Sequence, residues 1–133
     1  MFNQKTKNAI RIVTFLADNQ ELNKKCGATK IATKIGVSQP FTSKILQDLA
    51  RHNIITSTKG RGGGFYISET NQKKTIIDLI SVFEDHMQIY ECILGLPQCT
   101  DENPCVLHHI YKDFKMEIGA FLKKNIGKII PKN

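Results

Sequence analysis

Apolar and polar residues alternate through the first fifty positions with the period of α-helices. Apolar side chains recur three or four residues apart from Thr6 to Asn19, which predicts a helix with one buried face. A polar stretch then predicts a loop over residues 20–28. The next segment, TKIATKIG, predicts a short helix that Thr29 caps and Gly36 ends, because glycine readily adopts the left-handed conformation.

The segment SQPFTSKILQDLARHN predicts a second helix directly after the first. Ser38 is a suitable N-cap, Pro40 fits the first turn, and Asn53 can end the helix in the left-handed conformation. The predicted apolar stripe consists of Phe41, Ile45, Leu46 and Leu49. Thr42 is predicted to lie away from this stripe. Two short helices joined by a tight turn form either a helix-turn-helix or an unspecialised αα-hairpin.

The segment that follows favours the first of these alternatives. Two β-prone runs, IITST and GFYIS, flank the sequence KGRGGG, which predicts a tight hairpin. A hairpin directly after a helix-turn-helix makes a winged helix, in which the second helix enters the major groove and the hairpin touches the DNA backbone or the minor groove. The predicted DNA-contacting residues are Ser38, Gln39, Pro40, Phe41, Thr42, Lys44 and Gln47 in the helix and Lys59, Arg61, Gly62, Gly63 and Gly64 in the hairpin.

The second half of the chain contains two further amphipathic patterns. A capping box formed by Thr75 and Asp78 predicts a helix that continues to about Tyr90, and a long helix is predicted from Val106 to about Asn125. A small domain has little core to cover two long apolar stripes. The last helix therefore packs either on a second copy or back on the helix-turn-helix. We expect a homodimer, because a DNA reader usually needs two half-sites.

Charge separates the two halves of the chain. The net charge is +7, but residues 1–75 hold thirteen Lys and Arg against four Asp and Glu, whereas residues 76–133 hold six against eight. The basic half coincides with the predicted winged helix, which indicates a polyanionic partner. No run approaches eighteen apolar residues and the N-terminus lacks the apolar run of a signal peptide, so we expect a cytoplasmic protein without a membrane span.

Three of the four cysteines lie in the stretch CILGLPQCTDENPCVLHH, residues 92–109. The cytoplasm disfavours structural disulfides, so the cluster indicates metal or redox chemistry. Cys92, Cys99, Cys105 and His108 supply four ligands, enough for one zinc ion or one iron–sulfur cluster. We expect Cys105 and His108 on one face at the start of the last helix. The residues alone leave open a zinc-stabilised protein that binds DNA constitutively, and also a thiol redox enzyme.

Several segments together carry a resemblance to a known family: KNAIRIVTFLA, IATKIGVSQPFTSKILQDLARHNII, KGRGGGFYIS, TIIDLISVFED and the three clustered cysteines. The chain resembles the Rrf-two family of bacterial winged-helix regulators, which includes repressors. The resemblance implies a mainly α fold with a small β-hairpin. It divides the chain into a winged helix-turn-helix over residues 1–75 and a helix, a cluster loop (92–108) and a C-terminal dimerisation helix over residues 76–133.

The resemblance also implies a function. The protein would be a homodimeric transcriptional regulator and not an enzyme. It would bind a palindromic operator in double-stranded DNA, and an iron–sulfur cluster would control its DNA affinity in response to redox state, iron or nitric oxide.

The resemblance further implies a ligand set. Cys92, Cys99 and Cys105 match the three cluster cysteines of the family, and His108 falls where the [2Fe–2S] members have a histidine ligand. The nitric-oxide sensors instead take an aspartate from the partner's first helix and tend to hold [4Fe–4S]. Lys7 stands at that position here and is a poor ligand. This favours [2Fe–2S] over [4Fe–4S], although the segment EDHMQIYEC is closer to the nitric-oxide sensors.

Overall fold

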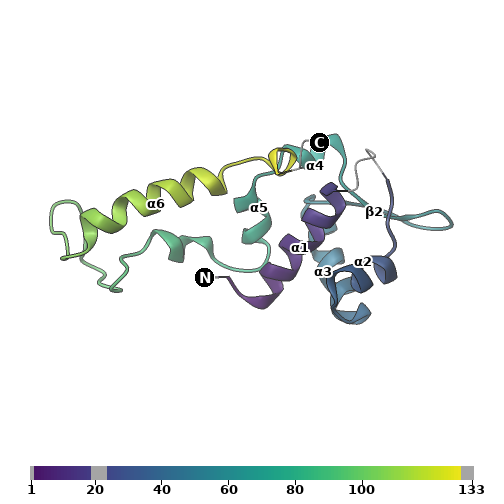
Figure 1. The fold of residues 1–133 in the computed structure, drawn as a ribbon, viewed down its shortest axis with the longest axis horizontal. Coiled ribbons are helices and arrows are strands. Elements are labelled where there is room, and N and C mark those ends of the chain that lie inside the picture. The colour runs from purple at the N-terminus through teal and green to yellow at the C-terminus, as the bar shows by residue number, and fades with distance from the viewer. Residues whose placement is uncertain (1, 19–23, 130–133) are drawn as a thin grey trace.

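The computed structural model describes residues 2–18 and 24–129 as a mainly helical fold with one small antiparallel hairpin (Figure 1). This confirms the predicted fold class. The helices are α1 (Gln4–Asp18), α2 (Ala28–Ile35), α3 (Gln39–Arg51), α4 (Glu69–Gln72), α5 (Ile76–Ser81) and α6 (His108–Leu122), with 3₁₀ helices η1 (His86–Tyr90) and η2 (Ile126–Lys128). The strands are β1 (Thr56–Thr58) and β2 (Gly64–Tyr66).

The core lies where α1, α2 and α3 meet. One face of each helix is apolar, and burying these faces together is the main source of stability in such a fold. The buried residues of this core include Ile12, Val13, Ile31, Ile35, Ile45, Leu46 and Leu49. Ile54 and Ile55, which the sequence assigns to a strand, are buried in the same core, and the strand begins only at Thr56. Asn19, the predicted end of the first helix, lies outside the described residues.

Helix α2 begins two residues earlier than predicted. Gly27 occupies the N-cap position and Thr29 lies inside the first turn, so the prediction that Thr29 caps the helix is wrong. The backbone of Cys26 exchanges two hydrogen bonds with Phe65, of 2.9 and 2.8 Å, which keeps the chain extended until it enters the helix. At the other end the prediction is confirmed, because Gly36 has a φ of 70°.

Helix α3 has the predicted bounds but a different buried face. Ser38 is the N-cap, although its hydroxyl makes no capping bond, and Asn53 has a φ of 61° as predicted. Phe41 is 70% exposed and Thr42 is fully buried, the reverse of the expectation. At about 100° per residue, Thr42 lies within about 15° of the centre of the buried arc and Phe41 about 90° from it. Position therefore outweighs residue type at this helix.

The hairpin is anchored by a polar network that the sequence pattern does not predict. Strands β1 and β2 pair with Thr56 opposite Tyr66. The buried Asn71 in α4 accepts a hydrogen bond of 2.7 Å from the hydroxyl of Thr56 and donates one of 2.9 Å to the carbonyl of Asn53. Asn71 also forms a capping box with Ser68, which begins α4. Helix α4 was missed because Ser68 was assigned to the preceding strand.

The capping box of Thr75 and Asp78 is present and begins α5 as predicted. The prediction of one helix up to Tyr90 is wrong, because α5 ends at Ser81 and the separate helix η1 begins at His86. Between them the backbone of Asp85 is extended, and its carboxylate accepts a hydrogen bond of 2.9 Å from the N–H of Met87. This new N-cap breaks the helix.

Glu84, in the same bend, ties the second half of the chain to the start of α1. Its carboxylate accepts hydrogen bonds from the hydroxyl of the buried Thr6 and, at 2.9 Å, from the N–H of Asn3. The bend before the cysteine loop is therefore fastened to the first helix of the chain.

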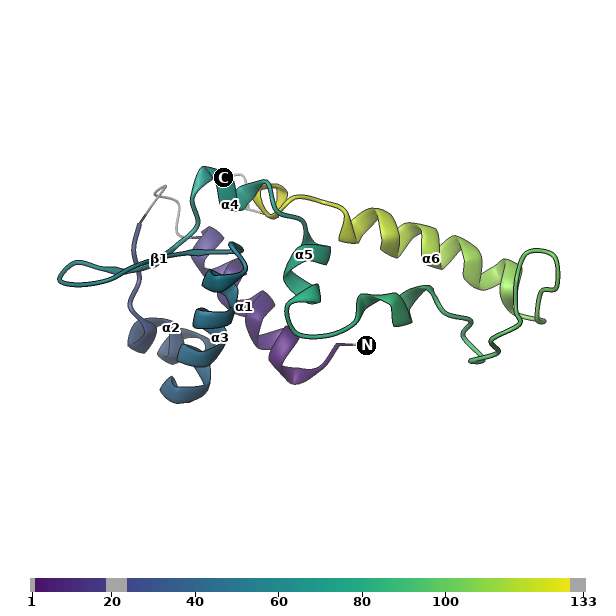
Figure 2. The same ribbon diagram turned by 180° about the vertical axis from the view of Figure 1, so that it is seen from behind.

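Helix α6 extends away from the other helices and has the cysteine-rich loop at its far end (Figures 1 and 2). It begins at His108 and ends at Leu122, and is shorter at both ends than predicted. Its base is fastened by a β-bridge between Thr75 and Asn125. Apart from Gly119 and Leu122, none of its residues is buried.

The apolar stripe of α6 is therefore mostly open to solvent. Its exposed large apolar residues are Ile110, Phe114 and Phe121. The accessible surface of the chain is 8620 Å², compared with about 7,000 Å² for a compact monomer of the same mass. The helix does not fold back on the helix-turn-helix, which was one of the two arrangements that the sequence allowed. Among the described residues, no helix is both long and apolar enough to cross a bilayer.

Candidate metal centre and nucleic-acid interface

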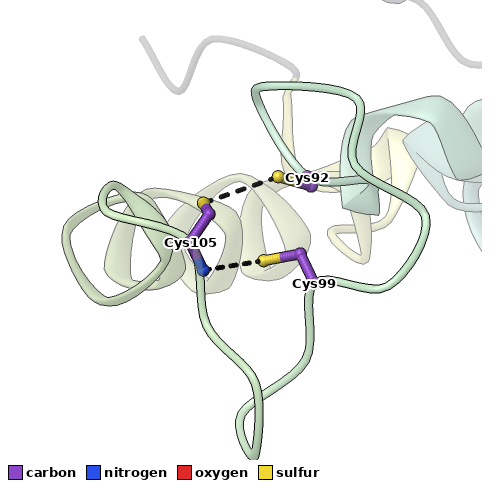
Figure 3. A group of neighbouring side chains, drawn as sticks. All are labelled: Cys92, Cys99 and Cys105. Carbon is purple, nitrogen blue, oxygen red and sulfur yellow. Dashed lines mark hydrogen bonds between the residues drawn. The ribbon is translucent and has the colours of Figure 1, made fainter.

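The three clustered thiols converge at the tip of α6 (Figure 3). Cys92 follows η1, Cys99 lies in the loop, and Cys105 precedes the first turn of α6. Their sulfur atoms all lie within 4.8 Å of one another, and those of Cys92 and Cys105 are 3.6 Å apart. The backbone N–H of Cys105 points at the sulfur of Cys99 across 3.4 Å. Residues 13 positions apart are thus brought to one point, as the spacing suggested.

His108 lies beside the three thiols, next to Cys99. His108 is the first residue of α6, and Cys105 lies in the turn before it. The prediction that Cys105 belongs to the helix is therefore wrong. The Nδ1 atom of His108 lies 3.2 Å from the sulfur of Cys99. The other ring nitrogen, Nε2, lies 2.7 Å from a carboxylate oxygen of Asp101, which also accepts a 3.0 Å hydrogen bond from Lys112. The ring of His109 faces that of His108 edge-on at 5.1 Å and takes no place in the group.

The local electrostatics differ between the thiols. Hydrogen bonds from the backbone, above all from Leu96, outweigh partial burial and lower the pKa of Cys92 from 9.0 to about 7. At Cys99 the backbone N–H of Cys105 also lowers the pKa, but burial and the two neighbouring thiols together raise it above its ordinary value. The hydrogen bonds from His108 and Lys112 hold the pKa of Asp101 at about 2. The thiol of Cys92 therefore ionises at a lower pH than that of Cys99.

The donor set suits a soft or borderline metal. Three thiols and one imidazole are ligands of zinc and of iron–sulfur clusters. A hollow of about 440 Å³ opens beside Cys92 and Cys99, with Tyr90 and Lys115 in its lining, so the thiols can be reached from solvent. These residues fit an inorganic centre without rearrangement of the core, because none of residues 90–118 is buried.

The exposed side of α3 presents most of the side chains predicted to contact DNA. Ser38, Gln39, Pro40, Phe41, Lys44 and Gln47 are exposed. Thr42 is the exception: its hydroxyl oxygen is buried without a hydrogen-bond partner among the described residues, and it cannot meet a groove. Phe41 and Lys44 border a hollow of about 330 Å³ against the start of α1.

The hairpin requires glycine for steric reasons at two positions. A Cβ on Gly63 would lie 2.3 Å from the carbonyl oxygen of Thr58, and one on Gly64 would lie 2.8 Å from that of Cys26. The φ of Gly64, 151°, also disfavours a side chain. The tip is therefore narrow, and Lys59 and Arg61 are exposed on it. A narrow basic tip can approach a phosphate backbone closely.

Residues 2–128 match the model of the Rrf2 family, described as an iron-dependent transcriptional regulator. The chain belongs to the Rrf2 family. Rrf2 proteins are transcriptional regulators that bind DNA, and they are not enzymes. The match confirms the resemblance seen in the sequence and excludes the thiol redox enzyme.

Individual relatives agree with the assignment to the Rrf2 family. An HTH-type transcriptional regulator of Aquifex aeolicus is 30% identical over 125 residues, which cover 92% of this chain and 85% of that protein. The solved structure of CymR, the global cysteine regulator of B. subtilis, has a TM-score of 0.71 at 14% identity and covers 98% of this chain and 95% of its own. That of T. potens IscR has a TM-score of 0.65 at 17% identity, with coverages of 97% and 85%. Both show the same winged-helix fold.

Sequence reasoning did not identify Asp101 and Glu84 as part of this Rrf2 site. Asp101 lies in the polar run TDEN, where nothing distinguishes it from its neighbour Glu102. Glu84 belonged to a helix that the pattern extended too far. Glu84 is recognised only from its contact with Thr6, a residue distant in sequence, and Asp101 only from the loop conformation that brings it to His108.

Proposed function

We propose that this Rrf2 protein is a cytoplasmic transcriptional regulator whose DNA affinity is controlled by an iron–sulfur cluster. The observation that carries the proposal is the convergence of three thiols at the free end of α6, with the imidazole of His108 beside the thiol of Cys99. The description of the family as iron-dependent supports iron as the metal. Cys92, Cys99, Cys105 and His108 would hold the cluster, [2Fe–2S] in preference to [4Fe–4S]. Such a cluster supplies sensitivity to oxidation, iron supply or nitric oxide.

The proposed DNA contacts come from α3 and the hairpin. Gln39, Phe41, Lys44 and Gln47 would face the bases, because they are the exposed side chains near the start of α3. Lys59 and Arg61 would contact phosphates. Two copies would read a palindromic operator, with the exposed apolar stripe of α6 as the interface between them. A stripe that the chain does not cover itself supports this arrangement.

The route from the cluster to DNA would run through the bend at Glu84. Occupancy of the thiol site would change the shape of the loop over 92–108, which is joined through η1 to that bend. Glu84 in turn holds the start of α1, which packs on α3. A small rotation would alter the distance between two recognition helices, and half-sites about 34 Å apart tolerate little change.

Anaerobic purification followed by visible spectroscopy and metal analysis tests the proposal. We expect a coloured protein with about two irons and matching sulfide per chain. Electrophoretic mobility shift of operator DNA should differ between the loaded protein and the protein stripped by a chelator. A colourless preparation without iron would refute cluster sensing, and equal DNA affinity in the two forms would refute control.

The compactness of the thiols favours a second candidate. Two sulfurs bound to one tetrahedral zinc ion lie about 3.8 Å apart, from a bond of about 2.3 Å. The 3.6 Å between Cys92 and Cys105 is close to this value. A structural zinc site in a constitutive DNA-binding protein would place one zinc per chain in the same metal analysis and leave the protein colourless.

A further inference from the structure

Asp101 occupies a special position beside the thiol site. Its carboxylate oxygen Oδ1 receives two hydrogen bonds, one of 2.7 Å shared with Nε2 of His108 and one of 3.0 Å from Nζ of Lys112. Asp101 comes from the loop between Cys99 and Cys105, whereas the other two residues belong to α6. The carboxylate thus joins the loop to the helix at the imidazole.

This contact determines which nitrogen of the ring faces the thiols. A carboxylate accepts hydrogen bonds, so Nε2 must carry the proton in this pair. The lone pair of a neutral ring is then on Nδ1, the atom that lies 3.2 Å from the sulfur of Cys99. A histidine that binds a metal through one nitrogen commonly donates its other N–H to a carboxylate, which fixes the orientation of the ring.

We propose that Asp101 is a positioning residue that holds His108 with Nδ1, and not Nε2, toward the metal. Lys112 keeps the carboxylate in place from the next turn of α6. The inference rests on the proposed function insofar as it concerns a bound cluster, but the hydrogen bond itself exists without one. The side chain of His108 is only 11% exposed while that of Asp101 is 65% exposed. Substitution of Asp101 therefore releases the ring without opening the core.

Three variants separate orientation from charge. Asp101→Ala removes the acceptor, whereas Asp101→Asn removes the charge but retains a carbonyl oxygen for Nε2–H. Glu102→Ala removes one negative charge from the neighbouring exposed residue and serves as the matched control. If Asp101 acts by orientation, Asp101→Asn resembles the wild type more than Asp101→Ala does. If it acts by charge alone, Asp101→Asn behaves like Asp101→Ala, which contradicts the proposal.

The first measurement uses the full chain, reduced and free of metal. At mildly alkaline pH, the Nε2–H proton of His108 should give a downfield resonance protected from exchange with water, identified by its loss in His108→Gln. Asp101→Ala should lose this protection, and Glu102→Ala should keep it. Protection that survives in Asp101→Ala would overturn the proposal. Because no cluster is needed, this result does not depend on the proposed function.

The second measurement uses the loaded protein. Histidine labelled with ¹⁵N at either ring position should show strong hyperfine coupling in the reduced cluster only for Nδ1. We expect Asp101→Ala to transfer its iron to a chelator about 10- to 100-fold faster than the wild type. Coupling to Nε2, or an unchanged transfer rate, would overturn the proposal. Failure to obtain any coloured protein would instead refute the proposed function, and the two failures are thereby distinguished.

Discussion

The two halves of the molecule obtain their order in different ways. In the winged-helix half, residues 2–75, α1, α2 and α3 bury apolar side chains against one another, and the hairpin is fastened by Asn71. We call residues 90–118 the cysteine arm. All of these residues are described, and none of them is buried. Local stability follows buried apolar contacts. The first half thus holds most of the buried core, whereas the arm has no buried residue of its own. Under the proposed function, a metal and a second chain would stabilise the arm.

The largest expected effect comes from comparing one substitution in the buried core of α3 with one on the exposed face of α6. Leu46→Ala in α3 removes a fully buried side chain and should lower the free energy of unfolding by about 2–5 kcal/mol. Ile110→Ala in α6 removes a side chain that is 75% exposed and should leave amide exchange in α1–α3 unchanged while shifting the protein from dimer to monomer. Denaturant titration, hydrogen exchange and sedimentation measure these outcomes. Destabilisation of α1–α3 by Ile110→Ala would contradict the division.

A smaller effect concerns the chemistry of the arm in the metal-free protein. Because the pKa of Cys92 is lowered to about 7, its thiolate form dominates above that pH. Its alkylation rate should rise through about pH 7 and then level off, whereas that of Cys99, whose pKa is raised, should still be climbing at pH 9.0. Peptide mass spectrometry follows each site, with the buried Cys26 as a slow control. Equal rates at the two arm thiols would show that the loop does not distinguish them.

The smallest effect concerns the hairpin tip. Arg61→Ala should weaken binding to all DNA sequences several-fold and reduce the salt dependence of binding by about one unit of slope, because one phosphate contact is lost. Fluorescence anisotropy at several salt concentrations measures both. The matched variant Arg51→Ala removes an arginine that pairs with Asp48 at the other end of α3, and it should change the slope less. A change in sequence preference with Arg61→Ala would contradict the proposed backbone contact.

Much of the winged-helix half could be predicted from the sequence because its signals are local. The apolar period, Gly36, Asn53 and the KGRGGG hairpin each report on their own neighbourhood. The exchange of Phe41 and Thr42 shows where such signals mislead, since a polar residue at a central helical position is buried by its neighbours. Residue type is a weaker guide than angular position in a short helix.

The arm was harder to predict because its order depends on contacts between distant residues. The four ligand candidates were found from their spacing, and the structure brings the three thiols together and places His108 beside Cys99. The end of α5 at Ser81 could not be predicted, because it follows from the capping of η1 by Asp85 and the bond of Glu84 to Thr6. Asp101 lies among other polar residues in the sequence, and only its hydrogen bond with His108 distinguishes it from them.

The absence of buried side chains between residues 90 and 118 also has a consequence for evolution and design. Within this segment, the loop over residues 92–107 holds no buried residue and can accept insertions, deletions or a new set of ligands at little cost in folding. The bridge of Thr75 to Asn125 and the bond of Glu84 to Thr6 would remain as fixed attachment points. The same DNA reader could therefore be coupled to a different chemical signal by exchanging one short segment.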